Sequence, residues 1–237
     1  MVIKDSRTGE SFVVDAKRAR IRHLCRRVRG WVDAIKPIAA NTREFEMKGL
    51  GLTIEDENVW NPRMISEYLY ALRKILGDRL VAYAWCAELQ ERGAVHYHVI
   101  LLLKRGTFVP FPDSSGMWVW GSSHITWDVH SPFYIISYLK KENYQKLGEF
   151  PKGLRMFHVW IEEGAVDKIA FCKFWLTTLP AWLEKEVLDH FRKYGSFYIP
   201  RRLKMGGWKV GSVAIKSPFE VVSYSSERVK DELYDAD

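Results

Sequence analysis

The sequence predicts an α+β fold, with a central antiparallel sheet, flanking helices and a C-terminal extension. Two patterns lead to this prediction. Runs rich in β-branched and aromatic residues are joined by short turns, as in antiparallel hairpins. Other stretches carry apolar residues at helical spacing and are bounded by serine, proline or glycine. The 237 residues, 47% of them hydrophobic, can fill the core of one domain or of a domain with an appendage.

The first helix and the first strand are expected before residue 55. Apolar residues recur at helical spacing in residues 15–35, and Pro37 is expected to end that helix. Residues 45–54 then favour a strand. Its two glycines, Gly49 and Gly51, indicate a close backbone approach.

A second helix and a hairpin follow. Pro62 is typical of a first helical position, and Gly77 is expected to stop the helix. Residues 80–89, rich in valine, tyrosine and tryptophan, predict a strand. Residues 91–94 predict the turn, and residues 95–103 the return strand.

The second half of the chain is expected to add helices and short strands. Ser131-Pro132 is an N-cap followed by proline, so a helix should begin there. Pro180 interrupts the last helical stretch. The expected strands are residues 124–129, 155–160, 208–215 and 219–224, and the expected helical stretches are residues 131–145 and 168–194.

The chain carries a formal net charge of +7, which makes nucleic acid the leading class of partner. Basic residues gather in the first predicted helix, between Lys17 and Lys36. Two interpretations stay open: a solvated amphipathic helix, or an arm that contacts phosphates. The DNA-binding candidates are Arg22, Arg26 and Arg29 of this helix and Arg92 of the predicted turn. Trp118, Trp120 and Trp127 either stack on unpaired bases or anchor a loop.

Several classes of protein are disfavoured. The apolar runs are too short for a membrane span, and the first residues lack the layout of a secretory signal, so no membrane partner is expected. The three cysteines, Cys25, Cys86 and Cys172, are widely spaced, odd in number and without a CxxC pair. They suit a reducing cytoplasm better than a disulfide framework or a zinc site.

The main candidate site lies in the predicted hairpin. His96 and His98 are two apart on a strand, so their imidazoles project from the same face and can share one metal ion. If the loop has an odd length, Glu88 of the preceding strand faces His98, whereas a two-residue loop would put it on the wrong side. Gln90 and Glu91 are alternative ligands, although Glu91 is expected in the turn. Such a set leaves positions on a divalent ion for a phosphate.

The second part of the candidate site is the helix predicted after Ser131. A nearby cation could assist a tyrosine nucleophile by polarising a phosphate. Helical spacing of i, i+4, i+7 and i+11 predicts one stripe of side chains. Its members are Tyr134, Tyr138, Lys141 and Gln145, the last a further DNA-binding candidate.

A His-hydrophobe-His strand followed by a helix with Tyr-x-x-x-Tyr-x-x-Lys resembles the rolling-circle replication initiators of the HUH endonuclease superfamily. The phrase Glu-x-x-x-x-Gly-x-x-His-x-His is similar to the replication proteins of phages and small plasmids. The resemblance covers roughly residues 45–160, and residues 48–54 stand for the family's first strand. By this resemblance, His96 and His98 are the metal pair, Glu88 the third ligand, Tyr138 the nucleophile with Lys141 beside it, and Tyr134 a second tyrosine.

The resemblance also implies an activity and a division of the chain. Residues 1–164 would form the HUH nuclease domain with a ferredoxin-like palm, and residues 165–237 a helical and β extension packed on it. The enzyme would use Mg²⁺ or Mn²⁺ to nick single-stranded or hairpin origin DNA, leaving a 5′-phosphotyrosine and a 3′-hydroxyl for a polymerase. The chain has no P-loop motif, so a separate host helicase would unwind the DNA.

Two rival functions stay open. A single-strand DNA transposase of the same superfamily would keep the site residues. It usually carries Tyr-x-x-x-Gln, whereas Tyr134 and Tyr138 are followed four positions later by Tyr138 and Glu142. A non-catalytic DNA-binding module would use the basic helix without cleaving DNA.

Overall fold

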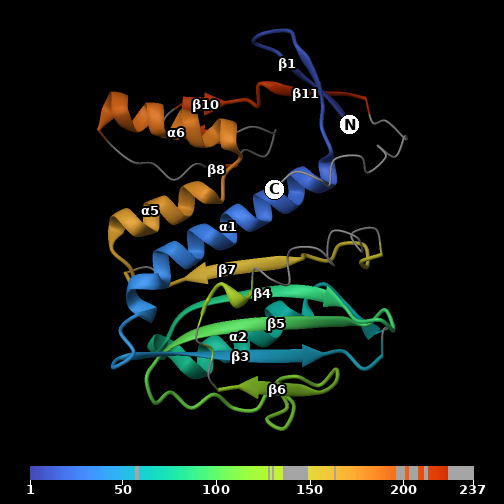
Figure 1. The fold of residues 1–237 in the computed structure, drawn as a ribbon, viewed down its shortest axis with the longest axis vertical. Coiled ribbons are helices and arrows are strands. Elements are labelled where there is room, and N and C mark those ends of the chain that lie inside the picture. Colours follow the sequence, from blue (N-terminus) through green and yellow to red (C-terminus); the bar gives the residue numbers. More distant parts are fainter. Residues whose placement is uncertain are drawn as a thin grey trace. The chain divides into compact units, whose positions relative to one another are not determined.

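The computed structural model describes residues 1–56, 59–127, 129, 131–135, 149–162, 164–195, 201–202, 208–210 and 213–223 (Figure 1). The chain is α+β, as the sequence predicts. It forms two compact units, one of residues 20–184 and one of residues 1–19 together with 185–237. The functional division predicted between residues 164 and 165 stays a prediction.

The larger unit is built on a five-stranded antiparallel sheet. Its strand order is β6-β3-β5-β4-β7. The strands are β3 (Phe45–Thr53), β4 (Leu80–Leu89), β5 (Val95–Lys104), β6 (Ser123–Thr126) and β7 (Phe157–Ile161). All five lie where the sequence predicts strands, with ends that differ by a few residues.

The central strands β4 and β5 are buried on both faces over most of their length. A strand covered on both sides shows a continuous apolar run in place of alternation. This accounts for the unbroken run Val99–Leu103, whose five side chains are all at most 1% exposed. Figure 1 shows helix α2 (Met64–Leu76) behind β4 and β5, where its apolar side chains are buried. Gly77 ends this helix with a positive φ of 55°.

Helix α1 (Ala16–Ala39) runs one turn farther than the sequence predicts. Pro37 lies inside its last turn and does not end it, which corrects the expectation. Proline removes only its own N–H donor, and the N–H of Ala40 still donates to the carbonyl of Lys36. The buried side of the helix includes Trp31, whose Nε1 donates to the Trp160 carbonyl of β7 at 3.1 Å.

The predicted helical stretch after residue 167 forms two helices. Asp167 caps α5 (Lys168–Thr177) by accepting hydrogen bonds from the N–H groups of Ile169 and Ala170. Helix α6 (Ala181–Tyr194) begins directly after Pro180, so the predicted interruption is confirmed. In the described ranges, no helix is long and apolar enough to cross a bilayer.

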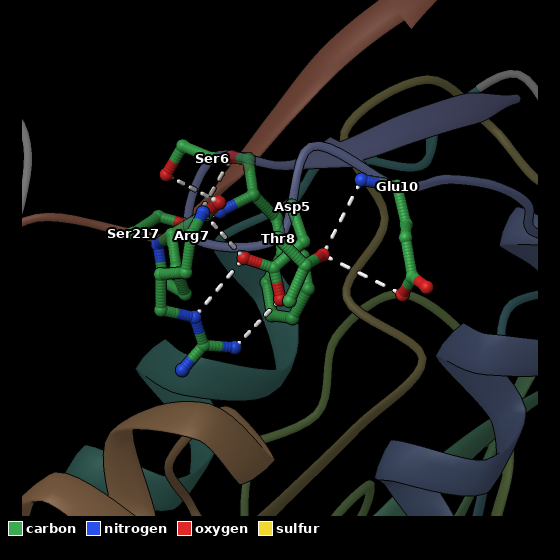
Figure 2. A network of polar contacts seen from close by, with 8 residues as sticks. Asp5, Ser6, Arg7, Thr8, Glu10 and Ser217 are labelled. Carbon is green, nitrogen blue, oxygen red and sulfur yellow. Dashed lines mark hydrogen bonds and ion pairs between the residues drawn. The ribbon is translucent and has the colours of Figure 1, made fainter.

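The smaller unit contains a sheet that pairs the two ends of the chain. Its strands are β11 (Phe219–Ser223), β1 (Val2–Asp5) and β2 (Ser11–Val13), in that order. The N-terminal strands were not predicted. Figure 2 shows the turn between them, in which the guanidinium of Arg7 donates to both carboxylate oxygens of Asp5, at 3.0 and 2.7 Å. These hydrogen bonds lower the pKa of Asp5 to about 2.

A second small sheet completes this unit. Its order is β10-β9-β8, formed by β8 (Arg201–Arg202), β9 (Trp208–Val210) and β10 (Val213–Ile215). The sequence predicts one strand over residues 208–215, and the structure has an antiparallel pair in which Val210 lies opposite Val213.

Candidate metal centre

The side chain of Tyr97 determines which way the two candidate histidines point. Tyr97 is 1% exposed and packs edge-to-face against Trp85 and Trp118. Its hydroxyl accepts a hydrogen bond from Trp60 Nε1 at 2.9 Å. Neighbouring residues of a strand point to opposite faces, so burying Tyr97 behind the sheet places His96 and His98 together on the other face. Their ring centroids lie 4.5 Å apart.

The hairpin register brings Glu88 to these histidines. The β4–β5 pairing places Glu88 directly opposite His96, and Cys86 opposite His98. The loop between the last paired residues, Leu89 and Val95, has five residues, so the odd-length prediction is confirmed. Glu88 Oε2 accepts a hydrogen bond from His98 Nε2 at 2.7 Å. Glu88 and both histidines therefore share one face of the sheet.

Thr53 of β3 supports His96 from the neighbouring strand. It lies opposite His96 in the β3–β5 pairing, and its hydroxyl is 2.9 Å from His96 Nδ1. When Nδ1 donates to this hydroxyl, the lone pair of Nε2 is left for a cation. A hydrogen bond of this kind sets the tautomer and the orientation of a metal-binding imidazole. Sequence reasoning placed Thr53 in the first strand without this role.

Gly51 makes room for a third imidazole. It lies between His98 of β5 and His124 of β6 in the two pairings of β3. The His124 ring occupies the space that a side chain at Gly51 would fill. This ring is nearly parallel to that of His96, at 13° and a centroid distance of 6.2 Å. The close approach predicted at Gly51 is therefore made by a side chain, and sequence reasoning had assigned His124 to a purely structural role.

Both histidines of β5 are held neutral at pH 7. Burial lowers the pKa of His96 to about 4, and the neighbouring His98 and His124 lower it further. Burial, followed by the charge of His124, also lowers the pKa of His98 to about 4. A neutral imidazole keeps the lone pair that binds a metal ion. The side chains of His98 and Glu88 remain partly accessible, at 16% and 24% exposure.

The donor set fits a small divalent cation. Glu88 Oε2 and His98 Nε2 lie 2.7 Å apart, close to the ~3 Å between adjacent ligands of an octahedral ion with bonds of ~2.1 Å. Within the described residues, no three histidine, cysteine or acidic side chains already form a metal cluster. Binding would therefore replace the Glu88–His98 hydrogen bond, and imidazole with carboxylate suits Mn²⁺ as well as Mg²⁺.

Residues 48–143 match the model of a family of replication-associated proteins, the ORF2 type. The matched range includes strand β3, the hairpin with Glu88, His96 and His98, and the sequence positions of Tyr134, Tyr138 and Lys141. The match supports a role in the initiation of replication. No curated protein and no solved structure matches the chain significantly.

The tyrosine segment is described only at its start. Ser131 Oγ accepts a hydrogen bond from the N–H of Phe133, as an N-cap does, and residues 134 and 135 are helical. Ile135 is buried and Tyr134 is 52% exposed, consistent with the predicted stripe. Tyr138, Lys141 and Gln145 lie outside the described residues, so their roles stay predictions.

The predicted DNA-binding arginines fall into two groups. Arg22 and Arg29 are exposed on α1. Arg26 instead forms an ion pair with Glu184 at 2.6 Å and donates to the carbonyls of Thr177 and Leu179. Arg92 donates to the carbonyl of Ile54 at 2.6 Å and to that of Glu55. Arg26 and Arg92 thus hold neighbouring segments together, and their role in binding DNA stays a prediction.

The three tryptophans have different surroundings. Trp118 is 1% exposed and donates to the carbonyl of Thr53 at 3.0 Å, so it anchors its loop to the site strand. Trp120 packs edge-to-face on Trp118. Trp127 is 50% exposed, with Lys48 Nζ 4.8 Å from its ring centroid. Of the three, Trp127 has the exposure that base stacking needs.

Replacing Thr53 with valine is expected to weaken binding of Mn²⁺ about tenfold, because loss of a hydrogen bond behind a metal ligand costs roughly 10- to 100-fold in affinity. Valine keeps the shape of threonine, so the fold should be retained. Isothermal titration with Mn²⁺ measures the effect, and Thr126→Val on the exposed edge strand is the matched control. Equal affinities of the two variants would contradict the role given to Thr53.

Proposed function

We propose that this chain is an HUH-type endonuclease that initiates rolling-circle replication of a plasmid or phage by nicking single-stranded DNA. The observation that carries the proposal is the placement of Glu88, His96 and His98 on one face of the sheet, with Glu88 hydrogen-bonded to His98. The family match supports it, because it covers this hairpin and the tyrosine positions after it. The function is thus argued from the site, and the fold is only compatible with it.

In this proposal, His96, His98 and Glu88 hold one Mg²⁺ or Mn²⁺. The ion supplies Lewis acidity at the scissile phosphate and offsets the charge on the leaving oxygen. Thr53 keeps the His96 ring in one orientation, and the buried Tyr97 keeps both imidazoles on the DNA-binding side. These contacts hold the donor atoms in place before DNA binds, which limits the cost of organising the site.

Tyr138 is the proposed nucleophile. Its phenolic oxygen loses its proton and forms a bond to phosphorus, while the bond from phosphorus to the 3′-oxygen breaks and that oxygen takes up a proton. The products are a 5′-phosphotyrosine and a free 3′-hydroxyl. A polymerase extends the 3′-hydroxyl, and attack of another 3′-hydroxyl on the phosphotyrosine later rejoins the strand. Lys141, one helical turn beyond Tyr138, is placed by the sequence to steer the phosphate.

The partners proposed are single-stranded or hairpin origin DNA, with a host helicase and a host polymerase in the host cytoplasm. The exposed arginines Arg22 and Arg29 and the net charge of +7 favour capture of the DNA backbone. Because these contacts read phosphates, sequence preference would have to come from other contacts with the bases.

Incubation with a diverse pool of single-stranded and hairpin DNA in Mn²⁺ tests the proposal. We expect a covalent protein–DNA adduct on denaturing gels, mapped to Tyr138 by mass spectrometry and lost with EDTA. Joining of paired transposon ends, without nicking at a replication origin, would favour the transposase. Binding of the pool without any adduct would favour the non-catalytic module and would overturn the proposal.

A further inference from the structure

A cavity of about 510 Å³ lies at the edge of the sheet, along strand β7. Side chains of α1, α2 and α5 complete its walls. Its lining includes Arg27, Arg73, His158, Trp160, Glu162 and Trp175. All of these residues belong to the unit of residues 20–184. The neighbouring β4 residues of His158 and Trp160 are Trp85 and Tyr83, which point away from the face that carries Glu88.

The cavity is separate from the candidate metal centre. Trp160 pairs with Tyr83, which is five residues from Glu88 along β4. At a rise of roughly 3.4 Å per residue, the two sites are about 17 Å apart along the strand and on opposite faces. Figure 1 shows the β7 arrow ending near α5, at the end of the sheet away from the β4–β5 turn.

Positive charge converges on this cavity from three elements. Arg27 comes from α1 and Arg73 from α2, and Arg155 precedes β7. The charges of Arg155, Arg27 and Arg73 all add to burial in lowering the pKa of His158 to about 4, so each acts on this imidazole. Arg155 likewise adds to burial in lowering the pKa of Arg27. Glu162 is the acidic residue in the described lining, and it is exposed.

The guanidinium groups are held in place by aromatic rings and keep unused donors. Arg73 lies 4.1 Å above the centroid of Trp160, which is stacked on Tyr83 from β4. Arg27 lies 4.9 Å above the centroid of Phe157. Arg27 Nε is buried and has no hydrogen-bond partner in the structure. A buried charged donor without an acceptor is costly, and an anion in the cavity would provide one.

We propose that this cavity binds a backbone phosphate of single-stranded DNA, at a segment away from the one held at Glu88, His96 and His98. Arginines that sit on aromatic rings keep their planar N–H groups directed, which suits the oxygens of a phosphate. Taking DNA as the source of the phosphate rests on the proposed function. The site itself would anchor the strand and would take no part in the cleavage step.

The double variant Arg73→Gln/Arg155→Gln tests this proposal. Both arginines are exposed, so their loss should leave the fold intact. Fluorescence anisotropy with a labelled single-stranded oligonucleotide is measured over a salt series in EDTA, where cleavage does not occur. Each phosphate contact contributes about 0.7 to the slope of log K against log salt, so we expect the slope to fall by about 1.4. We expect binding at low salt to weaken about tenfold.

Lys74→Gln is the matched control, because Lys74 is the exposed neighbour of Arg73 on α2 and does not line the cavity. Its slope should fall by no more than one nonspecific contact. Equal slopes for the wild type and the double variant would overturn the proposal. Calorimetric titration with inorganic phosphate identifies the source: phosphate binding lost in the double variant while DNA binding is unchanged would overturn DNA as the ligand. Failure of the proposed nicking would leave the EDTA result intact, so the two failures are distinguishable.

Discussion

Replacing Tyr138 with phenylalanine is expected to abolish the covalent protein–DNA adduct completely. The substitution removes one oxygen, and no other group at that position can form the bond to phosphorus. Binding of single-stranded DNA should remain, because the basic residues and the histidine site are untouched. Gel analysis of the adduct, beside anisotropy measurements of binding, separates loss of chemistry from loss of affinity.

Tyr134→Phe is the matched control for this prediction. Tyr134 is 52% exposed at the start of the same segment, so its hydroxyl can be removed without opening the core. If Tyr138 is the first nucleophile, this variant still forms the adduct. An adduct that persists in Tyr138→Phe and disappears in Tyr134→Phe would keep the enzyme class and reverse the assignment of the nucleophile.

The sheet could be predicted well because its information is local. The hairpin of β4 and β5 has long apolar strands and a short turn with Gly93 at a positive φ of 86°. The strand pair β1 and β2 was missed because it is short, polar and stabilised by β11, more than 200 residues away. Pro37 was read as a helix end because its effect depends on which N–H donors the following residues still use.

The candidate site was only partly predictable for a related reason. Strand periodicity and an odd turn place Glu88 with His96 and His98 through neighbours in sequence. Thr53 and His124 reach the site from β3 and β6, through pairings that no short pattern contains. Gly51 was the available signal for His124, since a missing side chain in a central strand marks space that something else fills.

Replacing Glu88 with glutamine is expected to lower nicking in Mg²⁺ by about 100-fold or more. Glutamine keeps the size of the side chain but removes the negative charge that a hard cation prefers. Even substitutions behind a metal ligand cost roughly 10- to 100-fold, so loss of the charged ligand should cost at least as much. Rates are measured with a fixed oligonucleotide, at rising Mg²⁺ and again at rising Mn²⁺. Because Mn²⁺ depends less on carboxylate and accepts imidazole, the loss should be smaller in Mn²⁺.

Glu91→Gln provides the comparison, since Glu91 lies three residues farther along the same hairpin and is exposed in the turn. Both variants lose one negative charge near the DNA, so a general electrostatic effect would change both rates equally. Only a ligand role makes Glu88 differ, because the register places its carboxylate 2.7 Å from His98 Nε2 and not in solvent. Equal rates for the two variants, with full activity in Mg²⁺, would remove Glu88 from the site. The metal would then have to rely on the imidazoles, and His124 would become the candidate for the third ligand, because its ring already lies parallel to that of His96.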